Sequence, residues 1–162
     1  LGKVYRDLIV KLSDEGYSVE LFSNGVDKDI AFIDWLLERY PNLKKDYQVT
    51  VENPGSAKEL VELLAGYERF MAVRLHAAIV GTVLGVPNVS LVWNRKQILF
   101  GEQTGLRQNF ITKEKFTSDE IFRRLCHAKP YEMDEDYKMS VYRNLEEQMN
   151  KWAIGEGKSR IQ

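Results

Sequence analysis

Apolar residues recur along this chain at two spacings, one typical of amphipathic helices and the other of buried strands. Val4, Leu8 and Leu12 repeat every four residues, which predicts a helix near the amino end that stops at Gly16. The apolar run 70–73 is short and bounded by polar residues, which indicates a strand. By the same criteria the sequence predicts helices over about 1–14, 27–40, 56–64, 76–84, 117–125 and 134–152, and strands over 17–22, 48–52, 70–73 and 88–92.

This alternation of strands and helices is typical of βαβ units. It predicts an α/β fold with a Rossmann-like parallel sheet and helices on both faces. We expect one such domain over 1–152 and a flexible tail over 153–162. Domains of this kind usually open with a central strand, whereas this chain opens with a helix. We therefore expect a strand, or a whole domain, before Leu1.

Composition narrows the classes of function. The 162 residues are 44% hydrophobic and 29% charged, as in soluble globular proteins. Lys and Arg number 23 and Asp and Glu number 24, so the near-neutral balance argues against nucleic acid as a partner. The single cysteine, Cys126, excludes a disulfide framework. No apolar run is long enough to cross a membrane, and we expect a cytoplasmic protein.

The most informative chemistry follows the predicted strand 70–73. Ligands of open parallel sheets bind beyond the carboxyl ends of the strands, where Arg74 and His76 stand before a helix of small residues. A guanidinium, a helix start and a histidine all favour an anion. The alternative is that Arg74 pairs with a structural carboxylate and His76 only caps the helix.

A second pair of cations, Arg95 and Lys96, follows the next predicted strand. Because neighbouring parallel strands end at the same edge, one anionic ligand can touch both loops. The alternative is a solvated loop. The sequence contains no glycine-rich phosphate loop, no nucleophile elbow and no His-Glu-x-x-His pattern, so we expect no metal.

The segment 72–79, Ala-Val-Arg-Leu-His-Ala-Ala-Ile, followed by Leu-Gly-Val-Pro at 84–87, resembles the signature of the polysaccharide pyruvyl transferase family. The family pattern continues with an aromatic-Asp-x-Lys segment, which here reads Trp-Asn-Arg-Lys over 93–96. The similarity extends from about Glu59 to Leu106. Asn94 stands where the family often has Asp, which puts any role of that carboxylate in doubt.

The resemblance implies the C-terminal, donor-binding half of a glycosyltransferase-B-like enzyme that transfers a pyruvyl group from phosphoenolpyruvate to a sugar of a cell-surface polysaccharide, forming a ketal. It places Arg74, Leu75 and His76 at the donor site. We expect His76 to act as the acid and Arg95 and Lys96 to help hold the donor, with no cofactor. The expected partners are a saccharide acceptor, in some cases lipid-linked, and a missing N-terminal domain, without which this chain is expected to be inactive.

Two other functions fit the sequence. One is the C-terminal domain of a sugar-nucleotide-dependent glycosyltransferase, which would need an acidic residue for the ribose. Glu102 is the nearest candidate. The other is a non-catalytic binding domain of a polysaccharide biosynthesis locus. That function is favoured if Arg74 or His76 is buried in a local salt bridge without an open pocket.

Overall fold

The computed structural model describes residues 1–132, 134, 136, 139 and 143. It divides into two compact units, Leu1–Tyr131 and Glu132–Gln162. The predicted helix 134–152 falls mostly outside the described residues, and the tail 153–162 does so entirely. Every predicted site residue therefore belongs to the first unit.

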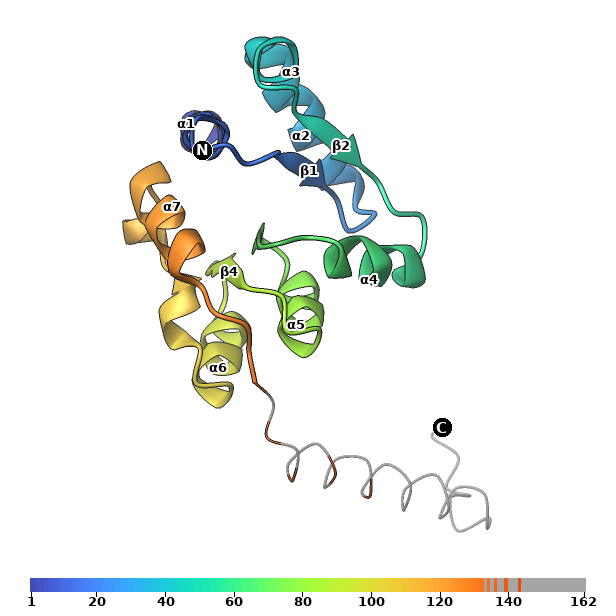
Figure 1. Ribbon diagram of the computed structural model, residues 1–162, viewed down its shortest axis with the longest axis vertical. Helices are drawn as coiled ribbons and strands as arrows, with labels where there is room; N and C mark the ends of the chain where they lie inside the picture. Colours follow the sequence, from blue (N-terminus) through green and yellow to red (C-terminus); the bar gives the residue numbers. More distant parts are fainter. Residues whose placement is uncertain (133, 135, 137–138, 140–142, 144–162) are drawn as a thin grey trace, which may run out of the picture. The chain divides into compact units, whose positions relative to one another are not determined.

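Strands and helices alternate through the first unit, as the hydrophobic pattern predicts (Figure 1). In chain order the elements are α1 Gly2–Asp14, β1 Glu20–Phe22, α2 Asp27–Arg39, α3 Asn42–Lys45, β2 Thr50–Glu52, α4 Ala57–Ala65, β3 Phe70–Ala72, α5 Leu75–Val83, β4 Asn88–Leu91, α6 Arg95–Gln103, η1 Arg107–Asn109, β5 Phe110–Ile111, η2 Lys113–Lys115 and α7 Ser118–His127.

The strands pair in parallel but form two sheets. β1 pairs with β2, and β3, β4 and β5 form a second sheet in that order. The sequence predicts parallel strands correctly, but it predicts one sheet. Within the described residues no ladder joins β1 to β3, because a cavity separates the two strands.

Helices cover both faces of the three-stranded sheet. On one face, Phe70 and Ala72 of β3 share a core cluster with Ala77 and Ala78 of α5. Met71 lies between them in the strand and packs instead on the core cluster that α1, β4, β5 and α7 form. Successive residues of a strand point to opposite faces, so this split shows a sheet covered from both sides.

Close packing of α5 on the sheet depends on glycine. A Cβ atom at Gly81 would overlap the ring of Phe70, so a larger residue would push the helix away from β3. Gly85 has a φ of +69°, a conformation that favours glycine, and turns the chain from α5 toward β4. Gly81 thus lets the last turn of α5 lie against the start of β3, and Gly85 follows that turn. Among the described residues, no helix is long and apolar enough to cross a membrane.

Candidate functional site: the exits of β3 and β4

Arg74 occupies the junction between β3 and α5 and pairs with Asp29 from the first turn of α2. Its Nε and Nη2 donate to the two carboxylate oxygens at 3.0 and 2.7 Å. The side chains are 34% and 26% exposed, so the pair lies at a surface and is not sealed in the core. The hydrogen bond to Asp29 raises the pKa of Arg74. Arg74 therefore does pair with a carboxylate, which the sequence allowed as the alternative to anion binding.

The ion pair neutralises Arg74 but does not use all of its donors. A guanidinium carries five N–H groups, and the two bonds to Asp29 leave three of them. Asp29 also faces Tyr5, whose pKa is raised to about 12 by burial and, secondarily, by the negative charge of Asp29. Arg74 therefore offers oriented donors for an anion but little net positive charge.

His76 lies in the first turn of α5 and is exposed. It is not the N-cap residue, because Arg74 holds that position and no side chain caps the helix. His76 makes no hydrogen bond within the part of the chain that the structure describes, and Leu75 beside it is half-buried. The first N–H groups of this nine-residue helix thus lack a side-chain acceptor, next to a histidine open to solvent.

The junction between β4 and α6 is built differently. Asn94 and Gln97 form a capping box. The Asn94 side chain accepts from the N–H groups of Lys96 and Gln97 at 2.9 and 3.3 Å. Arg95 and Lys96 are exposed on the first turn, and neither forms an ion pair with any described residue. Asn94 therefore serves as a cap, and the positive charge of this junction stays available.

Gln97 ties the two junctions together. It is fully buried, and its amide nitrogen donates to the carbonyls of Val73 and Leu91 at 3.0 and 2.7 Å. Its oxygen accepts from the N–H of Trp93 at 2.9 Å. The indole of Trp93 donates to the same Val73 carbonyl at 2.9 Å. These bonds hold the exits of β3 and β4 side by side.

Sequence reasoning missed Gln97, although a signal was present. Asn-x-x-Gln is a variant of the Ser/Thr-x-x-Glu capping box, which the sequence also shows at Ser56 and Thr117, where two of the predicted helices begin. It would have placed the start of α6 correctly, but it gives no indication that Gln97 is buried beneath the neighbouring junction.

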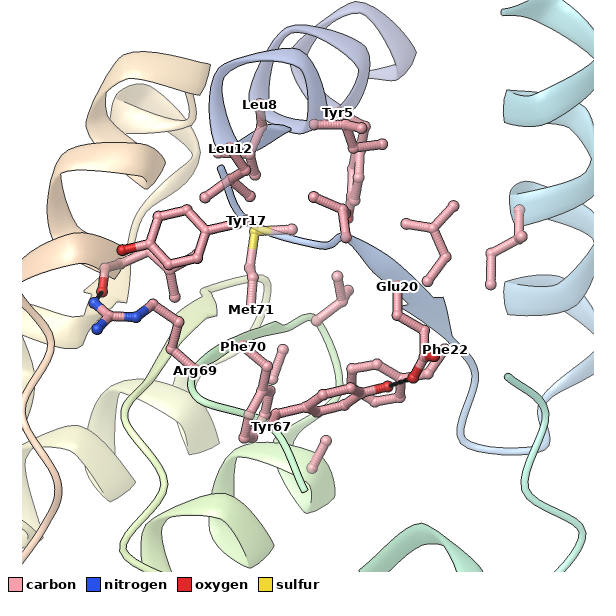
Figure 2. Close-up of a pocket in the computed structure, with 18 of the residues that line it drawn as sticks. Tyr5, Leu8, Leu12, Tyr17, Glu20, Phe22, Tyr67, Arg69, Phe70 and Met71 are labelled. Atoms are coloured by element: carbon pink, nitrogen blue, oxygen red, sulfur yellow. Dashed lines mark hydrogen bonds between the residues drawn. The ribbon is translucent and has the colours of Figure 1, made fainter. Parts of the chain in front are cut away.

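A cavity of about 680 Å³ opens beside Arg74, between β1 and β3 (Figure 2). Asn24, Asp29 and Arg74 line it at the carboxyl ends of these strands. Of the five predicted site residues, all of them described, Arg74 alone lines this cavity. The structure brings the two loops that carry these residues together, but it sets the cations of α6 outside the cavity. Among the described residues, no group of three or more His, Cys, Asp or Glu side chains is placed to hold a metal ion.

Comparison with known proteins identifies the family. The family model described as polysaccharide pyruvyl transferase matches residues 1–95 of the 162, more than half of the chain. The chain belongs to this family. The match starts well before Glu59, where the sequence similarity was expected to begin, and it includes Arg74, Leu75 and His76 but ends before Lys96. No curated protein and no solved structure matches the chain.

Proposed function

We propose that this chain is the donor-binding, Rossmann-like half of a glycosyltransferase-B-like pyruvyl transferase, which uses phosphoenolpyruvate to form a ketal on a saccharide. Family membership supports transferase activity on a polysaccharide. The observation that carries the finer proposal is the contrast between two adjoining helix starts. One offers oriented donors and an exposed histidine, and the other offers two cations that form no ion pair with a described residue.

Phosphoenolpyruvate carries two anionic groups, and the two junctions suit them. The carboxylate is planar and matches the remaining donors of Arg74 and the uncapped start of α5, beside Leu75. The phosphate carries more charge and suits Arg95 and Lys96 at the start of α6. Gln97 supports this division, because its bonds hold the two junctions next to each other.

In the reaction proposed, His76 donates a proton to the methylene carbon of the donor. The adjoining carbon becomes an oxocarbenium-like centre, which two sugar hydroxyls attack while its bond to phosphate breaks. Of the two hydroxyl protons, one ends in the new methyl group by way of His76 and the other ends on the released phosphate. General acid help of this kind contributes about 10² to 10⁴ in rate.

Binding of the donor can be tested on the present chain. Calorimetry with phosphoenolpyruvate should show a Kd at least tenfold weaker for the double variant Arg95→Ala/Lys96→Ala. Lys113→Ala/Lys115→Ala is the matched control, because it removes two exposed cations from another part of the surface. Equal affinity in both double variants would remove the start of α6 from the donor site. Tighter binding of a nucleotide sugar than of phosphoenolpyruvate would favour the sugar-nucleotide glycosyltransferase.

Chemistry needs the polypeptide that also carries an acceptor-binding half. There, His76→Ala should abolish ketal formation and leave donor affinity nearly unchanged, whereas Arg74→Ala should chiefly raise the donor KM. Ketal formation at the normal rate in His76→Ala would exclude His76 as the acid.

One observation favours a second candidate, a non-catalytic binding domain: Arg74 already has a carboxylate partner. Retention of the fold without any affinity for phosphoenolpyruvate would select that alternative.

A further inference from the structure

The cavity between β1 and β3 has the length and position of a missing β-strand. Gly16 and the six residues after it, 17–22, line one side of it, and nine consecutive residues, 66–74, line the other. Leu8 and Leu12 of α1 lie across it (Figure 2). A strand rises about 3.3 Å per residue, so the six-residue wall accommodates about six residues of extended chain.

On the side that faces the cavity, the backbones of β1 and β3 carry N–H and C=O groups that pair with no described strand. Toward β2, Ser23 N–H donates to Glu52 and the carbonyl of Val19 accepts from Thr50. Backbone groups of a parallel strand alternate between its two sides, so those of Glu20 and Phe22 face the cavity.

The same reasoning applies to β3. Phe70 N–H donates to Pro87 on the β4 side, which turns the backbone of Met71 toward the cavity. Within the described chain, β1 and β3 each pair with one strand only.

Both faces of this gap are apolar. One face carries Leu8, Leu12 and Met71, which belong to or pack on one core cluster. The other carries the rings of Phe22 and Phe70, whose centroids lie 6.0 Å apart across the gap. A strand that filled the gap would therefore need apolar residues at successive positions, as interior strands of parallel sheets have.

The charged groups of the lining are already paired, which argues against a polar ligand. Glu20 accepts from the hydroxyl of Tyr67, as Figure 2 shows, and Arg69 donates to the carbonyls of Leu125 and Cys126. Asp29 and Arg74 bind each other. Glu68 pairs with Arg69. Apart from the remaining N–H groups of Arg74, at the carboxyl end of β3, no charged side chain of the described lining is left to recognise a polar small molecule.

Burial along the strands supports the same interpretation. Val89 and Ser90 of β4, which has a neighbour on each side, are 0% exposed. In contrast, Leu21 and Phe22 of β1 and Met71 of β3 are only half-buried, although they are apolar residues of a parallel strand. A strand between β1 and β3 would bury them as completely as β4 is buried.

We propose that a parallel β-strand of about six apolar residues, joined by a short loop to the amino end of α1, fills this cavity and unites the two sheets into one. The order would then be β2, β1, the new strand, β3, β4, β5. Leu1 lines the cavity, and α1, which follows it for 13 residues, leads to the amino end of β1. The start of α1 therefore lies toward the carboxyl ends of the strands, where Tyr5 of its first turns senses the charge of Asp29.

The position of Leu1 determines the direction and the source of the strand. A parallel strand ends at that same edge, one loop away from Leu1, and α1 then forms the crossover that leads to β1. The occupant is therefore the segment that directly precedes Leu1. This inference does not rest on the proposed function.

The test extends the chain at Leu1 by Lys-Val-Val-Ile-Val-Val-Gly-Asn-Ser, a six-residue strand with a loop. The matched control has Pro at the second and fourth Val, which removes ladder donors. Hydrogen exchange at the amides of Glu20, Phe22 and Met71 is the readout. Ala72, whose backbone faces β4, is the internal reference.

We expect the extension to slow exchange at these three amides about 100-fold or more and to raise the Tm by about 10 °C, while the proline control changes neither. Light scattering should show a monomer. Failure of the extension to protect these amides would overturn the proposal. So would slow exchange in the chain without the extension: if that chain is monomeric and the three amides already exchange as slowly as Ala72, no strand is missing. Protection that accompanies a dimer of that chain would also overturn it, because a second copy would then fill the gap.

Discussion

The two strand–helix junctions at the carboxyl edge of the three-stranded sheet lie side by side, but their helices begin in different ways. At the exit of β3, α5 begins without a side-chain cap, and its Arg74 is neutralised by Asp29. At the exit of β4, α6 begins with a complete capping box, and its two cations have no ion pair with a described residue. The first junction keeps helix N–H groups available and uses its charge for orientation. The second uses its N–H groups for stability and keeps its charge.

This difference indicates that a strand–helix junction can present either backbone donors or side-chain charge to a ligand. The side chain at the N-cap decides between them. An Asn or Asp there occupies the N–H groups that an anion would otherwise use, so the positive charge must come from the residues that come after it. Four changes test whether the junctions differ in this way.

The largest expected effect is on the bond network that joins the two junctions. Gln97→Leu keeps the volume but leaves the N–H of Trp93 and the carbonyl of Leu91 without the Gln97 partner, and the carbonyl of Val73 keeps only the indole of Trp93. A buried group left unsatisfied costs about 1–3 kcal/mol, so with two such groups we expect a loss of about 3 kcal/mol in unfolding free energy. Urea denaturation measures it.

Gln103→Leu is the control for Gln97→Leu, since Gln103 is exposed on the same helix and should change stability by less than about 0.5 kcal/mol. A loss in Gln97→Leu no larger than in this control would show that the network does not hold the junctions together.

The second effect concerns Tyr5, which lines the same cavity as Arg74 and Asp29 and senses the charge of Asp29. Its pKa is raised to about 12, so the folded state favours the neutral phenol. The unfolded chain loses this proton near pH 10, and the folded chain does so only near pH 12. The stabilisation of the folded state by the neutral Tyr5 phenol is therefore complete below pH 10. It is lost as the pH rises to 12, which lowers the unfolding free energy by roughly 2–3 kcal/mol.

Tyr5→Phe should accordingly flatten the loss of stability between pH 10 and 12, as followed by urea denaturation at several pH values. Some loss should remain, because burial and the hydrogen bond to Glu20 also raise the pKa of Tyr67. An identical pH profile in the wild-type chain and in Tyr5→Phe would contradict the assignment.

The third effect isolates the cap of α6. Asn94→Ala removes the acceptor of two helix N–H groups and should cost about 1 kcal/mol, whereas Asn94→Asp should retain the cap. Thermal unfolding of the two variants measures the difference. Equal loss in both would mean that the capping box does not stabilise this junction.

The smallest effect is expected at the ion pair. Because Arg74 and Asp29 are partly exposed, Asp29→Asn should cost less than about 1 kcal/mol, and Asp27→Asn, in the same turn but exposed, should cost nothing measurable. The pKa of Tyr5 should also fall in Asp29→Asn, while burial keeps it above its ordinary value. NMR titration of Tyr5 reports this shift, and an unchanged pKa would separate Tyr5 from the junction.

The sequence predicted those features of the fold that depend on residues close together in the chain. The order of strands and helices follows from hydrophobic periodicity, and the caps at Ser56 and Thr117 form as their spacing predicts. Gly81 packs on Phe70 as a small residue of α5 was expected to pack. In each case the partners lie close in sequence, or one residue's size decides the contact.

Determinants that act between distant segments were not predictable in the same way. The pairing of Arg74 with Asp29 joins residues 45 positions apart, and nothing local distinguishes Asp29 from Asp27. The predicted strand over 17–22 forms only over Glu20–Phe22, because one of its sides has no neighbour among the described strands. β5 has two residues, too few to produce a periodic pattern.

The Arg74–Asp29 pair also has a mechanical consequence. Asp29 follows β1 and Arg74 follows β3, so their two hydrogen bonds act as a strut across the mouth of the gap between the sheets. Any change in the separation of the sheets pulls on the guanidinium that would receive the donor carboxylate. The affinity of Arg74 for an anion then depends on the distance between the two sheets. By thermodynamic reciprocity, an anion bound at Arg74 would in turn favour one width of the gap.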